Sequence, residues 1–329
     1  AMFEERMAVI EGAQAARATA TGMSAMTASL LCQLSAGDHV VAAKALFGSC
    51  RWLVDQLLPK FGIQTSVVNG PDLDAWKAAI TPQTKLFFFE TPANPTLDIV
   101  DIAGLAQMAK PTGIKLVVDN VFASPILQKP LSLGADVVAY SATKHIDGQG
   151  RCLGGIVLGS NEFVDDHLHN FLRHTGPALS PFNAWVLLKG LETLALRVAA
   201  HCRNAALIAD ALADHPKVER VVFPGRPDHP QAELAAKQMS LPGSLVGFHI
   251  TDGKDGAFRF MNALNLIRIS NNLGDARSLV THPATTTHHK LAPAERARVG
   301  ISPGFVRLSV GLEGADDLIA DIDRALASV

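Results

Sequence analysis

The segment 136–151 ends an apolar run with two hydroxyl groups, a lysine and a glycine-punctuated loop. It reads DVVAYSATKHIDGQGR, so Ser141, Thr143 and Lys144 follow the apolar residues directly. The run before them is typical of a buried strand in a parallel sheet, and such sheets bind ligands beyond the carboxyl ends of their strands. A lysine there can condense with a carbonyl cofactor, and the hydroxyls can hold a phosphate. Taken alone, the tetrapeptide fits a solvent-facing lysine more simply.

Two other polar residues follow apolar strands of the same kind. Asp119 ends KLVVD, and Asn94 lies in the proline-bounded turn after KLFFFE. Carboxyl ends of parallel strands share one sheet edge, so we expect both residues on the edge where Lys144 emerges. Each also has a simpler interpretation, a helix cap for Asp119 and a turn former for Asn94.

The remaining candidates would bind anions or an aromatic ring. Gly22 and Met23 open a helical run, where unpaired backbone amides favour a phosphate. Phe47 lies in the glycine-flanked turn ALFGS and can stack on a ring. Arg307 lies in the otherwise apolar strand FVRLSVG, where a buried guanidinium should meet an anion such as a substrate carboxylate.

Together these residues match the requirements of pyridoxal 5′-phosphate. Lys144 supplies the amine for the aldehyde, and Asp119 supplies a carboxylate that keeps the pyridine nitrogen protonated. The amides of Gly22 and Met23, with the hydroxyls of Ser141 and Thr143, supply a phosphate cradle.

The elements that position these residues alternate between strand and helix from His39 to Ser141, which predicts a mainly parallel α/β sheet covered by helices. The apolar run from Ser180 to His215 predicts two helices or one kinked helix, and we place the domain boundary inside it. Residues 1–190 are therefore expected to form a large cofactor-binding domain. Residues 191–329 carry short strands separated by helices and are expected to form a smaller α/β domain.

Composition excludes several classes of function. The formal net charge is −2 and there is no run of lysine and arginine, so nucleic acid is not an expected partner. No apolar stretch approaches the ~18 residues of a spanning helix. The four cysteines have neither CxxC spacing nor histidines at metal-ligand intervals, which favours a reduced, cytoplasmic protein without a metal. The histidines of THPATTTHHK also fit no common metal-ligand spacing.

The motifs resemble those of the Cys/Met metabolism family of pyridoxal-phosphate enzymes, in order and over essentially the whole chain. The matching blocks are FEERMAVIEG, ATATGMSA, ETPANPT, VVDNVFASP, SATKHIDGQG, GPALSPFNAWVLLKGLETLALR, NNLGDARSLVTHPATTTH and VRLSVGLE. The resemblance implies a fold type I transferase with a seven-stranded-type sheet in the large domain. It also implies Lys144 as the cofactor-binding and proton-transfer lysine, Asn94 as a hydrogen-bond partner of cofactor or substrate carboxylate, and Arg307 as the α-carboxylate anchor.

The sequence departs from the family pattern at two positions. Phe47 stands where much of the family has a stacking tyrosine, so a phenol is absent there. Asn272 stands where much of the family has a serine before Leu-Gly, which leaves its part in orienting the lysine open. The family also has a preceding segment whose tyrosine and arginine reach the phosphate of a neighbouring subunit. We expect that contribution to be absent from residues 1–329.

The resemblance further implies a reaction. The expected activity is a γ-replacement in which sulfide displaces the succinyl group of O-succinyl-L-homoserine, giving homocysteine on the route to methionine. The succinyl carboxylate is expected to need a cation, and Arg51 and Arg151 flank the motifs best placed for it, although each fits a surface position equally well. Alternatives are cystathionine γ-synthesis, γ-elimination from methionine or cystathionine, and, in a different class, an α/β oxidoreductase or binding protein. The family implies a homotetramer of dimers with shared active sites.

Overall fold

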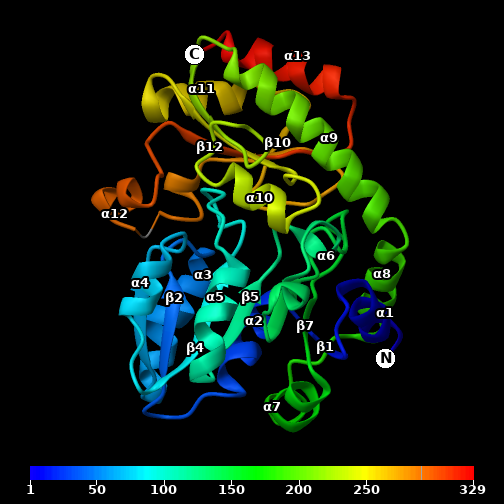
Figure 1. The fold of residues 1–329 in the computed structure, drawn as a ribbon. Coiled ribbons are helices and arrows are strands. Elements are labelled where there is room, and N and C mark those ends of the chain that lie inside the picture. The colour runs from blue at the N-terminus through cyan, green and yellow to red at the C-terminus, as the bar shows by residue number, and fades with distance from the viewer. Residues whose placement is uncertain (290) are drawn as a thin grey trace. The chain divides into compact units, whose positions relative to one another are not determined.

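The computed structural model describes residues 1–289 and 291–329, and the chain divides into two compact units (Figure 1). The first unit comprises Ala1–Asn94 and Asp98–Thr193, and the second comprises Pro95–Leu97 and Leu194–Val329. Each unit has its own β-sheet.

The sheet of the first unit has seven strands in the order β1-β7-β6-β5-β4-β2-β3. The neighbours from β3 to β6 are parallel, whereas β7 is antiparallel to both β6 and β1. The sheet is thus mainly parallel, which confirms the predicted fold class. Its strands are β1 (Ala15–Thr19), β2 (His39–Ala43), β3 (Gln64–Val68), β4 (Thr84–Glu90), β5 (Lys115–Asp119), β6 (Val137–Ser141) and β7 (Gly155–Gly159).

Helices and short helical turns connect these strands. The α-helices are α1 (Met2–Glu11), α2 (Gly22–Leu31), α3 (Gly48–Trp52), α4 (Leu73–Ala78), α5 (Ile102–Ala109), α6 (Ser124–Leu127), α7 (His169–Thr175) and α8 (Pro181–Leu191). The π-helical segments are η1 (Leu53–Leu57) and η5 (Phe163–Leu168), and the 3-10 turns are η2 (Leu58–Phe61), η3 (Lys110–Thr112) and η4 (Pro130–Leu133).

Aromatic packing joins one face of this sheet to the helices that cover it. Trp76 of α4 and Leu105 of α5 share a core cluster with Phe87 and Phe89 of β4. Side chains alternate between the faces of a strand, so Phe87 and Phe89 point to the same side. Every position of β2 is buried, which is the pattern expected for a parallel strand covered on both faces. The packing fixes the strands whose ends carry the polar residues.

The second unit contains a five-stranded sheet in the order β10-β11-β12-β9-β8. All its pairs are antiparallel except β10 with β11. Its strands are β8 (Val218–Val222), β9 (Leu245–Ile250), β10 (Arg268–Ile269), β11 (Leu279–Thr281) and β12 (Phe305–Ser309). Its helices are α9 (Leu194–Ala213), α10 (Ala232–Gln238), α11 (Gly253–Ala263), α12 (Pro293–Arg298), α13 (Ala315–Leu326) and the 3-10 turn η6 (Pro283–Thr285).

The core of the second unit determines which way Arg307 points. Val306 and Leu308 of β12 pack in one cluster with Phe260 of α11 and Ile322 of α13. Because side chains alternate along a strand, Arg307 lies on the opposite face of this sheet. The arginine is therefore separated from the helical core of its own unit.

The elements follow the predicted alternation, with two additions. The apolar run from Ser180 forms two helices, α8 and α9, as one of the two predicted arrangements has it. The short strands β1 and β11 were not predicted. Strand β1 reads AARAT and lacks β-branched apolar residues; it is held by pairing with β7 along its whole length. No helix of the described residues has the length and apolar composition needed to cross a membrane.

Candidate active site

One edge of the first sheet gathers the residues predicted to bind a cofactor. Asp119 ends β5 and Ser141 ends β6, and these strands are parallel neighbours. Lys144 follows in a tight turn, in which its N–H donates to the carbonyl of Ser141 at 3.2 Å and its carbonyl accepts from Gly148 at 2.8 Å. The lysine and the aspartate thus leave the same edge of the sheet.

Asp119 is a buried acid next to a positive charge. Its side chain is 4% exposed, and its Oδ1 accepts a 3.1 Å hydrogen bond from the N–H of Val121. Burial raises the pKa of Asp119 to about 7, although the Val121 N–H and the charge of Lys144 both act to lower that pKa. Ionising this carboxyl is costly unless a cation meets it, which is what a protonated pyridine nitrogen would do.

The start of α2 forms an anion cradle against the end of β6. The Thr21 side chain caps the helix by accepting from the N–H of Ser24 at 3.0 Å. A Cβ at Gly22 would come within 2.5 Å of both Cβ and Oγ of Ser141. Only glycine therefore lets the first amides of α2, those of Gly22 and Met23, approach the serine hydroxyl. Helix-terminal amides beside a hydroxyl favour a phosphate.

Thr143 makes a different contact from the one predicted. Its Oγ1 accepts from the N–H of Gly154 at 3.1 Å and donates to the carbonyl of Gly154 at 3.4 Å. These bonds tie the lysine turn to the start of β7. A phosphate contact from Thr143 would require its hydroxyl to turn away from the Gly154 carbonyl, so this role stays a prediction.

Phe47 and Asn94 lie near the end of β4. Phe47 directly precedes α3, and its N–H donates to Oε2 of Glu90 at 2.8 Å. Asn94 follows β4 and is 3% exposed. Glu90 ends β4 and is paired in register with Asp119 of β5. The turn that carries the phenylalanine is thus fastened to the strand next to that of Asp119.

Arg307 belongs to the second unit. Its side chain is 1% exposed, and its Nη2 donates to the carbonyls of Asn271 at 3.0 Å and Asn272 at 3.3 Å. The backbone of Asn272 therefore helps to orient the guanidinium. The role of Arg307 as a carboxylate anchor stays a prediction.

The two arginines considered for the succinyl carboxylate both have partners within the first unit. Arg51 Nε pairs with Oδ2 of Asp55 at 2.7 Å, and its Nη1 donates to the carbonyl of Lys44. Arg151 Nε pairs with Oδ1 of Asp147 at 2.9 Å, and Asp147 also accepts from the backbone N–H of Arg151. The Arg151 pair closes the loop that follows Lys144.

Sequence reasoning missed two residues at this edge. Glu90 ends an apolar strand beside Asp119, and the signal that identified Asp119 could have identified it. Cys50 is buried, and its Sγ lies 4.0 Å from Oδ2 of Asp119 as a hydrogen-bond donor. Burial, with the charges of Asp119 and Glu90, raises the pKa of the Cys50 thiol, which keeps its proton. No sequence pattern pointed to this thiol.

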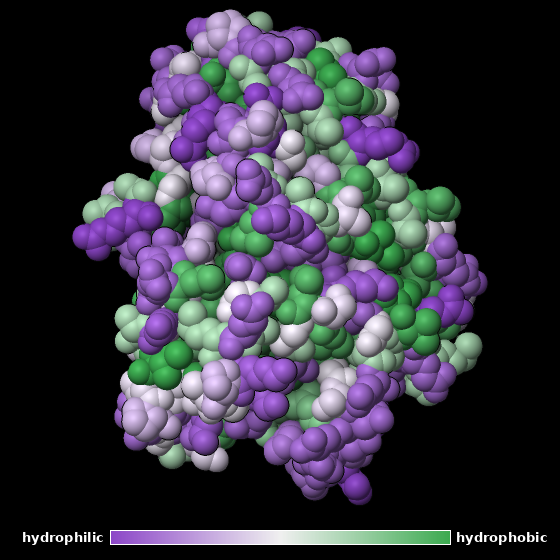
Figure 2. All heavy atoms as spheres, in the orientation of Figure 1, coloured by the Kyte–Doolittle hydropathy of each residue, from purple (hydrophilic) through white to green (hydrophobic). Residues whose placement is uncertain are grey.

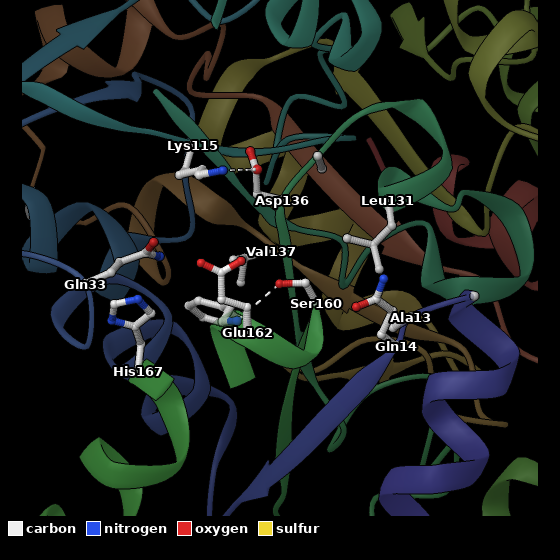
Figure 3. A pocket seen from close by; sticks show the side chains of 14 residues that line it. Ala13, Gln14, Gln33, Lys115, Leu131, Asp136, Val137, Ser160, Glu162 and His167 are labelled. Carbon is white, nitrogen blue, oxygen red and sulfur yellow. Dashed lines mark hydrogen bonds and ion pairs between the residues drawn. The ribbon is translucent and has the colours of Figure 1, made fainter. Parts of the chain in front are cut away.

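A separate pocket of about 340 Å³ lies at the opposite ends of β5 and β6 (Figure 3). Lys115 begins β5, its Nζ pairs with Oδ1 of Asp136 at 3.0 Å, and both residues line this pocket. Glu162 and His167 also line it. None of the predicted site residues contributes to it, so it is distinct from the candidate active site. Across residues 1–289 and 291–329, no group of three or more His, Cys, Asp or Glu side chains could hold a metal ion.

The residues at the carboxyl edge of β5 and β6 fit pyridoxal 5′-phosphate. Lys144 lies near Asp119, a buried acid that ionises readily only next to a cation. The start of α2 at Gly22 has no room for a side chain and faces the hydroxyl of Ser141. The three groups match the aldehyde, the pyridine nitrogen and the phosphate of that molecule.

Comparisons with known proteins agree with this chemistry. The family described as Cys/Met metabolism PLP-dependent enzyme matches residues 1–327. The O-succinylhomoserine sulfhydrylase of Mycobacterium tuberculosis is 54% identical over 99% of this chain and 81% of its own, and that of Pseudomonas aeruginosa is 50% identical with the same coverage. The crystal structure of cystathionine γ-lyase from Lactobacillus plantarum complexed with L-serine is 37% identical, covers 99% of this chain and 85% of its own, and has a TM-score of 0.96.

Proposed function

The chain belongs to the Cys/Met metabolism family of enzymes that use pyridoxal 5′-phosphate, and on that basis we propose that it converts O-succinyl-L-homoserine and sulfide to L-homocysteine and succinate. The names of the two relatives at 54% and 50% identity support this substrate pair. The observation that carries the proposal is the buried acid Asp119 beside the charge of Lys144 at the edge of a parallel sheet.

When bound, the cofactor withdraws electrons from the substrate's α-carbon, provided that its pyridine nitrogen stays protonated. Asp119 holds that proton in place: the raised pKa of its buried carboxyl reflects the cost of an unpaired anion, and the pyridinium charge removes this cost. Cys50 donates to the second carboxylate oxygen and so limits rotation of the carboxylate.

Lys144 moves the protons in this proposal. Its amine takes the proton from the α-carbon of the substrate and, after releasing that proton, takes one from the β-carbon. Succinate then leaves the γ-carbon with the electron pair of the broken C–O bond, and hydrosulfide adds there. Lys144 finally returns one proton to the β-carbon and one to the α-carbon, so both C–H bonds are restored. Phe47 has no phenolic hydroxyl, so its ring only covers a face of the cofactor and leaves proton transfer to the lysine.

The remaining residues bind and orient. The amides of Gly22 and Met23 and the hydroxyl of Ser141 hold the phosphate, with Thr143 adding to them if its hydroxyl turns. Asn94 hydrogen-bonds the cofactor or the substrate carboxylate. Arg307, already oriented by the carbonyls of Asn271 and Asn272, offers its guanidinium to the α-carboxylate.

Lys144→Ala tests the assignment of the lysine. The variant should lose the absorbance band that the protein-bound cofactor shows near the edge of the visible range. It should also lose all turnover of O-succinyl-L-homoserine. Lys115→Ala is the matched control, because Lys115 lies at the opposite end of the sheet. Normal turnover by Lys144→Ala would refute the proposed site.

The rival reaction on the same site is γ-elimination or cystathionine formation, and the likeness to a cystathionine γ-lyase structure favours this rival. Turnover of O-succinyl-L-homoserine should be measured with sulfide, with cysteine and with neither. Homocysteine formed faster than either cystathionine or the elimination product supports the sulfhydrylase reaction. Faster elimination without a nucleophile contradicts it.

Self-association into a tetramer of two dimers, with shared active sites, is part of the proposal. An apolar surface on α1 and α8 supports it (Figure 2). Val9 is 77% exposed and Trp185 58% exposed, and both line a groove of about 520 Å³ with Met2 and Leu188. The other residues that line it are charged: Glu5, Arg6, Lys189 and Glu192. Apolar patches of this kind mark association sites. Light scattering of Val9→Lys should report a smaller assembly than that of the unsubstituted protein.

A cytoplasmic location is also proposed, and the four free cysteines suit it.

A further inference from the structure

A buried chain of hydrogen bonds runs from α1 to the turn after β5. The hydroxyl of Tyr140 donates to Oε2 of Glu11 at 2.5 Å and accepts from Nδ2 of Asn120 at 2.7 Å. Nε2 of Gln128 in turn donates to Oδ1 of Asn120 at 2.7 Å. None of these four side chains is more than 1% exposed. They come from the end of α1, from β6, from the residue after β5 and from the end of α6.

The bonds in this chain share one direction. Gln128 donates to Asn120, Asn120 donates to Tyr140, and Tyr140 donates to Glu11, so the carboxyl group is the terminal acceptor. In a low-dielectric interior, aligned bonds polarise one another and strengthen toward a charged acceptor. The protonation state of Glu11 therefore affects the shortest of the bonds that Nδ2 of Asn120 donates. The same Nδ2 also donates to the backbone carbonyls of Gln128 at 2.9 Å and Ser124 at 3.3 Å.

Asn120, an inner member of this series of hydrogen bonds, lies next to the acid at the cofactor edge. Asn120 directly follows Asp119, and its N–H donates to the carbonyl of Ala139 in β6 at 3.2 Å. The next residue, Val121, donates its N–H to Oδ1 of Asp119. Fixing Asn120 from both its backbone and its side chain thus fixes the turn from which the Asp119 carboxylate is directed.

Glu11 is in an unusual electrostatic environment. Burial raises its pKa to about 7, against the Tyr140 hydroxyl, the charge of Lys129 and the backbone of Leu131, which all act to lower that pKa. Its Oε1 is buried without a hydrogen-bond partner. Such a carboxyl gains or loses its charge near neutral pH. The change in charge alters the strength of the hydrogen bonds from Gln128 to Glu11.

We propose that Glu11 and Tyr140 are positioning residues that, through Asn120, hold the Asp119 carboxylate in line with the pyridine nitrogen of the cofactor. The inference rests on the proposed function, because it takes Asp119 as the partner of that nitrogen. Neither residue touches the cofactor or the substrate. The simpler alternative is that these hydrogen bonds only hold α1 against the sheet, in which case they contribute to stability and not to cofactor binding.

Two readouts separate the alternatives: the dissociation constant of pyridoxal 5′-phosphate, followed by its absorbance, and the melting temperature of the cofactor-free protein. Tyr140→Phe removes the hydroxyl that joins the two ends of the chain. Thr84→Val is the matched control, because it removes a buried hydroxyl bonded to His39 at 2.8 Å from the opposite end of the same sheet. Both variants should melt at lower temperature. Only Tyr140→Phe should bind the cofactor more weakly, by about tenfold.

Glu11→Gln provides a second, independent test. The amide oxygen still accepts from Tyr140, so cofactor affinity at pH 6 should change little. The side chain no longer ionises, so the change in cofactor affinity between pH 6 and pH 8 should be smaller than in the unsubstituted protein. This variant decides the matter if Tyr140→Phe fails to fold.

Asp119→Asn distinguishes failure of this inference from failure of the proposed function. The inference is wrong if Asp119→Asn binds the cofactor weakly while Tyr140→Phe binds it as Thr84→Val does. It is also wrong if Glu11→Gln keeps the pH profile of the unsubstituted protein. If Asp119→Asn binds the cofactor normally, the assignment of Asp119 fails, and the positioning role fails with it.

Discussion

The backbone N–H of Phe47 donates a 2.8 Å hydrogen bond to Oε2 of Glu90, across 43 residues of sequence. Glu90 is 1% exposed and ends the strand beside that of Asp119. One buried carboxylate therefore joins the turn that carries the aromatic ring to the edge of the sheet that carries the acid. The relative position of the ring support and the pyridine partner depends on it.

Glu90→Ala should weaken cofactor binding by about tenfold, because it leaves the partly buried Phe47 N–H without this acceptor and frees the turn. Glu90→Gln keeps an oxygen in the same place and should stay within about threefold of the unsubstituted protein. Titration with pyridoxal 5′-phosphate measures both. If glutamine weakens cofactor binding as much as alanine does, the charge of Glu90 matters rather than its bond to Phe47; if neither variant weakens binding, the bond does not support the site.

Gly22→Ala should disrupt the phosphate cradle, because the added Cβ would lie 2.5 Å from Oγ of Ser141. We expect cofactor affinity to fall at least tenfold, since the start of α2 must move away from β6. Gly113→Ala is the control: its Cβ meets no atom within 4 Å, and its positive φ of 73° costs about 1–2 kcal/mol of stability without touching the cradle. Unchanged affinity in Gly22→Ala would place the phosphate elsewhere.

Arg307→Lys should raise KM for O-succinyl-L-homoserine by about 100-fold with a smaller effect on kcat, because lysine cannot form the two parallel bonds that a guanidinium makes to a carboxylate. Cofactor affinity should be unchanged, which separates lost anchoring from unfolding. Arg268→Lys changes an exposed arginine of the same unit and serves as the control. An unaltered KM in Arg307→Lys would remove Arg307 from the substrate site.

The cofactor-free protein should lose stability as the pH rises from about 4 to about 7. Glu11 and Asp119 hold their protons up to about pH 7 when folded, against ordinary pKa values of 4.5 and 3.8. Between these limits the unfolded chain binds fewer protons than the folded one, so the free energy of unfolding falls with pH. The raised pKa of Glu11 alone corresponds to a decrease of about 3 kcal/mol in the free energy of unfolding over this pH range.

Urea denaturation at pH 5 and pH 8 measures this effect. Glu11→Gln should lose less stability between the two pH values than the unsubstituted protein, because its side chain stays neutral throughout. Glu162→Gln, which removes an exposed carboxylate, should behave like the unsubstituted protein. Equal losses in Glu11→Gln and the unsubstituted protein would mean that Glu11 is not held neutral by burial.

The alternation of apolar runs with helical patterns predicted most of the first sheet and the edge at which its polar residues emerge. The sequence predicts Asp119 and Lys144 on one edge because parallel strands end together. In the structure, Asp119 ends β5 and Lys144 closely follows the parallel neighbour β6. Strand β1 has no β-branched apolar residue and strand β11 has only three residues, so neither pattern can be distinguished from loop. Such strands form because a neighbouring strand offers unpaired backbone groups, which is a property of the assembled sheet.

Local patterns predict the residue types at and just beyond the strand ends, because the aspartate, the serine, the lysine and the glycine at a helix start each have a local signal. The buried groups that support these residues depend on tertiary packing. Tyr140 lies in the otherwise largely apolar strand β6, and its partner Glu11 lies 129 positions away at the end of α1. Neither residue type carries a signal for the other, because their pairing results from packing that brings distant segments together and buries polar groups that must then bond to each other.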